Sequence, residues 1–226
     1  MKKIFLLLSL FFCFSVSQAQ VKVGLRVAPG IGLNSVADKN SSDGLNYSKG
    51  PASFAFSVGP NVETYLNDHI SFCTGLWWTA RKVSVQTSNP VISNYTSSLQ
   101  YIQLPLSFKA YSNEFANRIK IYVQLGGTVD VKISDKLTSS SPDISAIPGY
   151  RYEKWYQYSN LGLLGAIGTE FRIGNSNALY TGIFYQRGMI NQARNFNNSL
   201  GGNRNDFAHN ARVALSILAL EAGFKF

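Results

Sequence analysis

One stretch of this chain, RIKIYVQLGGTVDVKIS from Arg118 to Ser134, alternates residue by residue between apolar and polar side chains. The apolar residues share one parity, interrupted by Gly127: Ile119, Ile121, Val123, Leu125, Val129, Val131 and Ile133. Successive side chains of a strand point to opposite faces, so the pattern predicts one two-faced strand. It is about 16 residues long, whereas strands most often have about five or six. An apolar face of this length needs an extended apolar surrounding, which a lipid bilayer provides.

Similar alternation recurs along the chain and predicts eight strands, at residues 21–33, 54–66, 70–86, 99–111, 118–134, 156–173, 178–193 and 211–226. The connections alternate between long polar loops and short turns. An even number of strands, with short turns at one end and long loops at the other, is typical of outer-membrane barrels. Closing the sheet into a barrel gives every strand two neighbours, so the backbone N–H and C=O groups are hydrogen-bonded without water, as lipid requires. We therefore predict an all-β fold, an eight-stranded antiparallel up-and-down transmembrane β-barrel with short periplasmic turns and long extracellular loops.

Two of these strands have a competing helical interpretation. The segment LGLLGAIG, residues 161–168, has glycines at a spacing of three, and residues 213–222 are rich in Ala and Leu. The first run is too short to span a membrane as a helix, and its glycines fit a thinned barrel wall or bulges. In the second, residues 220–226 return to strict alternation. We interpret both as strands.

The N-terminus predicts export. Lys2 and Lys3 precede an apolar run from Ile4 to Val16, and Ser17–Ala19 fits a small-x-small cleavage site. This is the pattern of a secretory signal peptide, which assigns residues 1–19 to the signal and residues 20–226 to the outer-membrane barrel domain. The run is too short for a spanning helix. A lipoprotein would acylate Cys13, but that residue lies inside the run and not at its end.

Composition limits the possible chemistry. Cleavage leaves Cys73 as the only cysteine, so the mature chain forms no intramolecular disulfide. One cysteine and two distant histidines, His69 and His209, do not make a metal cluster, and we expect no cofactor. The formal net charge is +9, but the basic residues are scattered, which argues against nucleic acid as a partner. The excess positive charge fits a barrel lumen and contact with lipopolysaccharide better than it fits nucleic-acid binding.

The inward parity of the predicted strands is strongly charged. Its candidate lumen residues are Arg26, Glu63, Arg81, Lys109, Lys120, Asp130, Lys132, Glu170, Arg172, Arg187 and Glu221. An eight-stranded barrel is only wide enough for side chains to fill it, and buried charges must be paired. We predict a structural network of ion pairs that plugs the lumen. A narrow ion path or a small-ligand pocket is the alternative, and the pairing depends on a register that the sequence does not give.

Catalysis is the weakest interpretation. Asp206 and His209 lie three residues apart, and such a pair can activate water or a serine. They lie in an Asn-rich loop, and no nucleophile motif surrounds any serine. We therefore predict that the protein is not an enzyme and has no catalytic residue.

Four short motifs resemble those of PorT-like outer-membrane β-barrel proteins of Gram-negative bacteria. They are YIQLPL at Tyr101–Leu106, VKVGLRVAPG after the signal, YQRG within Gly182–Gly188 and the F-K-F terminus. The resemblance covers the mature chain and implies a cell outer membrane location. For some members it implies roles in secretion or gliding. It also implies that Phe224 and Phe226 form the signal read by the barrel-assembly machinery.

Three classes of function fit these observations. The first is a non-enzymatic barrel with a structural or surface-interaction role, whose extracellular loops contact a protein or glycan at the cell surface. The second is an accessory component of an outer-membrane secretion or motility complex, and the third is a narrow pore or small-ligand barrel. Loops rich in Tyr, Ser, Asn and Gly suit adaptable contacts and favour the first class. The expected partners are outer-membrane lipid, lipopolysaccharide and the barrel-assembly machinery.

Overall fold

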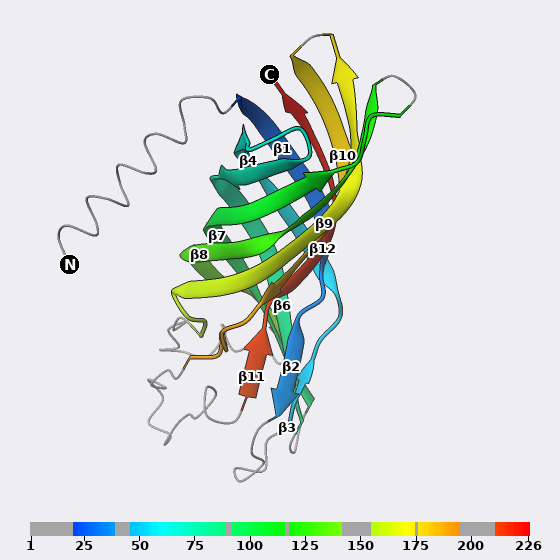
Figure 1. Ribbon diagram of the computed structural model, residues 1–226. Helices are drawn as coiled ribbons and strands as arrows, with labels where there is room; N and C mark the ends of the chain where they lie inside the picture. Colours follow the sequence, from blue (N-terminus) through cyan, green and yellow to red (C-terminus); the bar gives the residue numbers. More distant parts are fainter. Residues whose placement is uncertain are drawn as a thin grey trace, which may run out of the picture.

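The chain forms one antiparallel β-barrel (Figure 1). The computed structural model describes residues 20–38, 46–88, 92–115, 118–141, 155–174, 176–194 and 211–226. Its strands are β1 (Val21–Gly32), β2 (Ser35–Asp38), β3 (Asn46–Lys49), β4 (Ser53–Tyr65), β5 (Ile70–Gly75), β6 (Trp77–Ser88), β7 (Ile92–Tyr111), β8 (Ile119–Ser141), β9 (Ser159–Ile173), β10 (Asn177–Gly188), β11 (Ala211–Ala214) and β12 (Ser216–Lys225). The predicted signal peptide, residues 1–19, lies outside the described part of the chain.

The barrel closes because β1 pairs with strands from both ends of the sheet. One edge of β1 joins β12, with Leu25 opposite Phe224, and the other joins β4, with Val27 opposite Val58. The ring runs β1, β4, β5 with β6, β7, β8, β9, β10 and β12, so neighbours in the chain are neighbours in the barrel. This confirms the predicted eight-stranded up-and-down topology. Within the described ranges, no helix is long and apolar enough to cross a membrane.

The two ends of the barrel differ. The C-terminus and the short connections, such as residues 66–69 between β4 and β5, lie at one end, which we call the turn end (top of Figure 1). The other end, the loop end, carries the small β2–β11 sheet and the pairing of β3 with β6. Both segments that had a competing helical interpretation are strands, β9 and β12.

Prolines account for one departure from the predicted strands. The predicted strand at residues 70–86 is divided at Leu76 into β5 and β6. Pro60 on β4 and Pro105 on β7 lie beside this break, between the paired positions of both ladders. Proline has no backbone N–H to donate, so neither neighbour completes the ladder there. The parity of the side chains is kept across the break, because Cys73 and Trp77 are both buried.

Strands β7 and β8 extend further than the pattern predicts. The predicted strands ended at Leu99 and Ser134, whereas β7 begins at Ile92 and β8 ends at Ser141. The added residues are mostly Ser, Thr and Asn on both faces, so they give no alternation of apolar and polar residues. Their strand structure comes from pairing within the hairpin, with Thr96 opposite Ser139.

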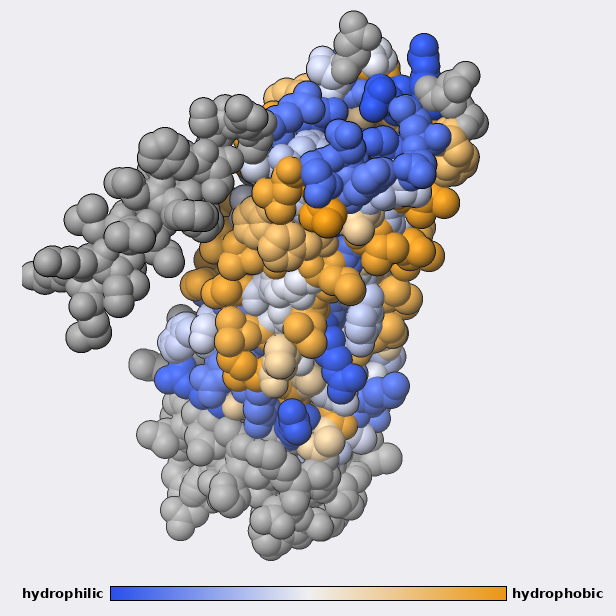
Figure 2. Space-filling model, viewed as in Figure 1, coloured by the Kyte–Doolittle hydropathy of each residue, from blue (hydrophilic) through white to orange (hydrophobic). Residues whose placement is uncertain are grey.

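Alternating burial along the strands separates lumen from lipid. On β8, Val123 is 44% exposed whereas Gln124 is only 6% exposed. Large exposed apolar side chains of this kind come from every position of the ring, and Figure 2 shows a band of apolar residues across the middle of the face in view. Hydrophilic side chains cover the turn end above the band. The surface therefore has the polarity of a protein that crosses a bilayer.

Glycines on two adjacent strands make space for a tyrosine in the lumen. Gly168 on β9 is paired with Gly182 on β10, and the hydroxyl of Tyr122 lies over both. A Cβ atom added at Gly168 would come within 2.6 Å of that hydroxyl and 2.2 Å of the Thr181 carbonyl oxygen. These glycines therefore thin the wall to admit a large ring.

Candidate functional site

A cavity of about 270 Å³ opens at the turn end of the lumen. Its wall includes Lys22 on β1, Arg118 before β8, Lys120 on β8 and Arg172 on β9. Arg172 forms an ion pair of 3.5 Å with Glu114, and its side chain is 47% exposed. The rim of the cavity is charged and open to solvent, and deeper side chains close its floor.

The floor is built around Lys225, the penultimate residue of the chain. Its ammonium group donates hydrogen bonds to Glu63 on β4, at 2.8 Å, and to Glu170 on β9. The Tyr111 hydroxyl on β7 also contacts both carboxylates. Lys109 adds a second cation 3.5 Å from Glu63. Five side chains from four strands thus close the lumen with paired charges, as burial requires.

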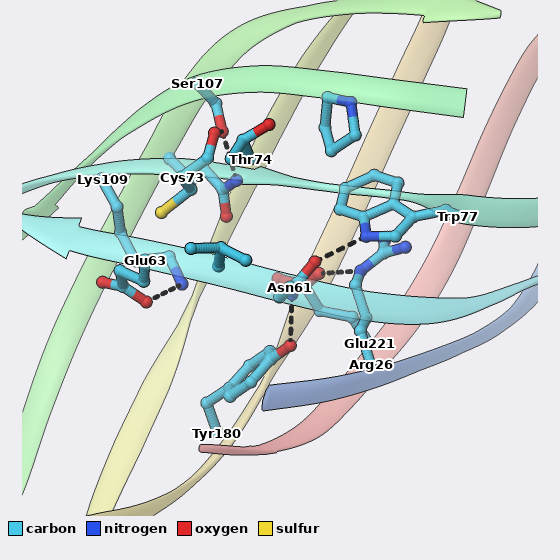
Figure 3. A pocket seen from close by; sticks show the side chains of 13 residues that line it. Arg26, Asn61, Glu63, Cys73, Thr74, Trp77, Ser107, Lys109, Tyr180 and Glu221 are labelled. Carbon is cyan, nitrogen blue, oxygen red and sulfur yellow. Dashed lines mark hydrogen bonds and ion pairs between the residues drawn. The ribbon is translucent and has the colours of Figure 1, made fainter. Parts of the chain in front are cut away.

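The next level is centred on Arg26 of β1 (Figure 3). Its Nε donates to Glu221 on β12 at 2.8 Å, and the Tyr122 hydroxyl donates to the same carboxylate. The guanidinium lies between two rings, 3.9 Å from the centroid of Trp77 and 4.2 Å from that of Phe184. Cation–π contacts of this kind are strongest where water is excluded.

Little space remains beside this level. A cavity of about 10 Å³ lies among Arg26, Lys109, Cys73 and Tyr180, which is close to the minimum for one water molecule. Asn61 bridges the cavity wall by accepting from Trp77 Nε1 at 2.5 Å and donating to the Tyr180 hydroxyl at 2.8 Å (Figure 3).

The middle of the barrel is crossed by a chain of amides. Gln103 on β7 donates to Gln186 on β10 at 3.2 Å, and Gln186 donates to Asp130 on β8 at 3.2 Å. Asn160 on β9 donates to the same carboxylate at 2.8 Å. Arg81 on β6 forms a longer ion pair of 3.7 Å with Asp130. Strands that are not neighbours in the ring are therefore joined directly across the lumen.

The loop end of the lumen is apolar. Its buried cluster consists of Val83, Val85, Leu99, Tyr101, Trp155, Tyr156, Ala193, Val213 and Leu215. One ion pair lies among these residues, between Lys132 and Asp135 at 2.6 Å, and Lys132 also donates to the Tyr156 carbonyl. This cap covers the amide level from outside. Across the described strands, every level of the lumen is occupied by side chains.

The structure brings most of the predicted lumen residues together. Eight of them are buried inside the barrel: Arg26, Glu63, Arg81, Lys109, Asp130, Lys132, Glu170 and Glu221. Lys120 is half-buried and Arg172 exposed, and both lie at the mouth of the lumen and not inside it. Their strands pass the turn end of the bilayer there, so inward parity does not bury them.

The prediction for Arg187 is wrong. Its neighbour Gln186 is buried in the lumen, so strand alternation directs Arg187 to the outer face, where it is exposed. The sequence around it, YQRG, does not show which parity of β10 is apolar. Arg187 lies near the loop end, where its long side chain can extend along the wall to the head groups.

Two important lumen residues were not predicted. Lys225 lies on the inward parity of β12, between the outward-facing Phe224 and Phe226, so strict alternation would have identified it. Asp135 follows a β-bulge that shifts the register between β7 and β8 and reverses the parity of β8. No pattern in the sequence marks that bulge.

The arrangement gives no catalytic geometry among the described residues. His69 lies in a turn, where its Nδ1 is 3.3 Å from the Tyr111 carbonyl oxygen. Asp206 and His209 lie outside the described part of the chain. The buried carboxylates of the lumen are all bonded to cations or amides, which is the chemistry of a structural plug.

A family model described as an outer membrane protein beta-barrel domain matches residues 16–205. Solved structures that are similar include Neisserial surface protein A, NspA, at 13% identity and a TM-score of 0.49, over 92% of this chain and 98% of that one.

Two further similar structures are the N-terminal β-barrel domain of Pseudomonas aeruginosa OprF and the Escherichia coli outer membrane protease OmpT. The OprF domain has 10% identity and a TM-score of 0.40, over 92% of this chain and 100% of that one. OmpT has 9% identity and a TM-score of 0.48, over 92% of this chain and 96% of that one. No curated protein matches the sequence.

Proposed function

The chain belongs to the outer membrane protein beta-barrel domain family, and we propose that it is a non-enzymatic barrel that acts through its extracellular surface. The turn end faces the periplasm and the loop end the cell exterior, as in other barrels of this location. The proposed role is structural or adhesive, through contact with a protein or glycan at the cell surface.

The filled lumen is the observation that carries this proposal. Ion pairs, amides and an apolar cap occupy the barrel from the periplasmic mouth to the extracellular end. A barrel that offers no interior path has its two ends and its outer wall available for function. The described extracellular part extends well beyond the apolar band, because β7 and β8 continue as a paired hairpin to Ile92 and Ser141.

Aromatic side chains at the extracellular end support a contact surface. Tyr158, just before β9, is 50% exposed, whereas the buried Trp155 packs edge to face against the half-buried Tyr95 of β7 with ring centroids 5.2 Å apart. Tyrosine and tryptophan supply large rigid contact areas at a low cost in conformational entropy. The packing of Trp155 against Tyr95 holds the base of one extracellular loop against the hairpin.

An accessory role in a secretion or motility complex is the second candidate. The charged periplasmic cavity of about 270 Å³ favours it, because a partner on that side would meet Lys120 and Arg172 at an open mouth. The YIQLPL motif supports a place among PorT-like barrels, for which such roles are known in some members. The outward-facing Phe224 and Phe226, 37% and 62% exposed, are available to the barrel-assembly machinery.

Site-specific photocross-linking in living cells tests the choice between the two ends. A photoreactive phenylalanine would replace Thr138, exposed on the extracellular part of β8, and in a matched strain Asn113, exposed at the periplasmic end. We expect a discrete cross-linked product at Thr138 and none at Asn113.

A product at Asn113 alone would select the accessory role and contradict the proposed one. The absence of products at both positions would also contradict a surface-interaction role. A heat-dependent shift in gel mobility should show that both photoreactive variants insert and fold, so that a missing product reflects a missing contact.

A further inference from the structure

Exposed charges are distributed unequally between the two ends of the outer wall. At the extracellular end, the exposed charged side chains that the structure describes are all cationic: Lys49, Lys82, Lys136, Arg187 and Arg212. The acidic side chain described there, Asp135, is buried in the lumen, as is Asp130 in the middle of the barrel. At the periplasmic end, Asp68 and Glu114 accompany the exposed arginines. The extracellular cations therefore have no matching surface acids among the described side chains.

Two of these cations lie at one level on neighbouring strands. Lys82 on β6 is paired with Ser98 on β7, and Ser98 is paired with Lys136 on β8. All three side chains point outward, because their chain neighbours Arg81, Val83, Ser97, Leu99 and Asp135 are buried. Strands lie about 4.8 Å apart, so the two lysine backbones are separated by about 10 Å. Both ammonium groups can reach a single group placed over Ser98.

This row lies just outside the apolar band. Four residues further toward the periplasm on β6 and β7, and five on β8 because of the bulge, the outward residues at one level are Trp78, Ile102 and Val131. Four strand residues span about 13 Å along the strand, which is about 10 Å along the barrel axis for a strand tilted by about 40°. The lysines are therefore at the depth of lipid head groups, and tryptophan is typical of the interface just beneath it. Figure 2 shows hydrophilic side chains between the band and the extracellular end.

We propose that Lys82 and Lys136 bind a phosphate of lipopolysaccharide in the outer leaflet, with the Ser98 hydroxyl as an additional donor. The described residues give neither lysine an ion pair. Two ammonium groups and a hydroxyl complement the negative oxygens of one phosphate. The barrel's outer-membrane location is sufficient for this inference, which is independent of any protein or glycan partner.

Lipopolysaccharide retention by the purified full-length barrel tests the site. The protein in detergent micelles would be titrated with lipopolysaccharide, and the bound fraction measured by native mass spectrometry. We expect the double variant K82Q/K136Q to bind about thirtyfold more weakly, because each lysine near an anionic lipid surface contributes about a fivefold effect. The control K22Q/K120Q removes the same charge at the periplasmic mouth and should leave binding unchanged.

Further experiments distinguish a phosphate of lipopolysaccharide from other sources of phosphate. The variant K82R/K136R keeps both charges and should retain most of the binding. Enzymatically dephosphorylated lipopolysaccharide should bind the unmodified barrel weakly. Its affinity should match that of native lipopolysaccharide for K82Q/K136Q. Equal binding of phosphatidylglycerol, or competition by millimolar inorganic phosphate alone, would overturn the assignment to lipopolysaccharide. Equal losses in K82Q/K136Q and K22Q/K120Q would reduce the effect to net charge and also overturn it. Lys82 and Lys136 are exposed, so the heat-dependent gel shift should show that both variants fold.

Discussion

Lys225 lies one residue from the C-terminus, yet its ammonium group joins strands on opposite parts of the barrel. It is 2% exposed and bonds to Glu63 on β4 and Glu170 on β9. Because β12 is the strand that closes onto β1, these bonds form only when the ring is closed. A single side chain thus couples closure of the barrel to closure of the floor of the periplasmic cavity.

Replacing Lys225 by methionine should strongly destabilise the barrel. Among the described residues, the change leaves Glu170 with the Tyr111 hydroxyl but no cation, whereas Glu63 keeps Lys109 at 3.5 Å and the hydroxyls of Ser71 and Tyr111. Removing one partner of a buried ion pair costs about 3–5 kcal/mol. Urea unfolding in lipid vesicles would measure the loss in free energy of unfolding.

The control for this change is Lys120→Met, at the open mouth and without an ion pair among the described residues, which should cost far less. Adding Glu170→Gln to K225M should recover part of the stability, because it removes the unpaired carboxylate. Equal costs for K225M and K120M would refute a closing role for Lys225.

At the scale of the element, β8 has one face toward lipid and the other toward the polar lumen. Leu125 is 65% exposed toward lipid, whereas its neighbour Gln124 is 6% exposed and donates to the Ser107 hydroxyl at 2.7 Å. Strand alternation produces this difference without any change in backbone conformation. A shift of one residue in register would exchange the two environments.

Arginine at Leu125 should reduce stability according to its depth in the bilayer. Leu125 lies near the middle of the outward row of β8, and Val131 lies near its extracellular end, level with Trp78. A lipid-facing arginine costs about 2–4 kcal/mol at the midplane and about 0–1 kcal/mol near the interface. Leu125→Arg should therefore cost clearly more than Val131→Arg in reversible urea unfolding. The same cost at both sites would show that this face of β8 does not lie in lipid.

For the whole molecule, closure of the ring and filling of the lumen depend on the same side chains. Eight strands leave an interior that side chains can fill, and this chain fills it with charges, amides and aromatic rings from all eight positions of the ring. The buried groups have partners from distant strands, such as Arg26 with Glu221, so each pair also fixes the barrel's shape.

Planar-bilayer recordings of the refolded protein should show no sustained conductance. The amide level around Asp130 and the apolar cap outside it leave no continuous water path along the described lumen. Reproducible ion-selective openings that change in Asp130→Asn, but not in Lys120→Gln at the mouth, would instead establish a pore.

The sequence by itself determined the class of fold and most of the lumen. Alternation identifies the lipid face wherever one parity is uniformly apolar, as on β8, because a bilayer imposes that uniformity over the whole span. The same rule places Arg26, Glu63, Asp130 and Glu221 in the interior. It fails for Arg187, where the parity of β10 is ambiguous, and for Arg172, where the strand has left the bilayer.

Only the tertiary structure decided which charges meet. Arg26 and Glu221 are 195 residues apart in the chain, and their contact depends on the register of β1 against β12. The alignment of Lys82, Ser98 and Lys136 depends in the same way on two registers and on the bulge in β8. Register is set by hydrogen bonds between distant strands, so a pattern read within one strand reveals its faces but not its partners.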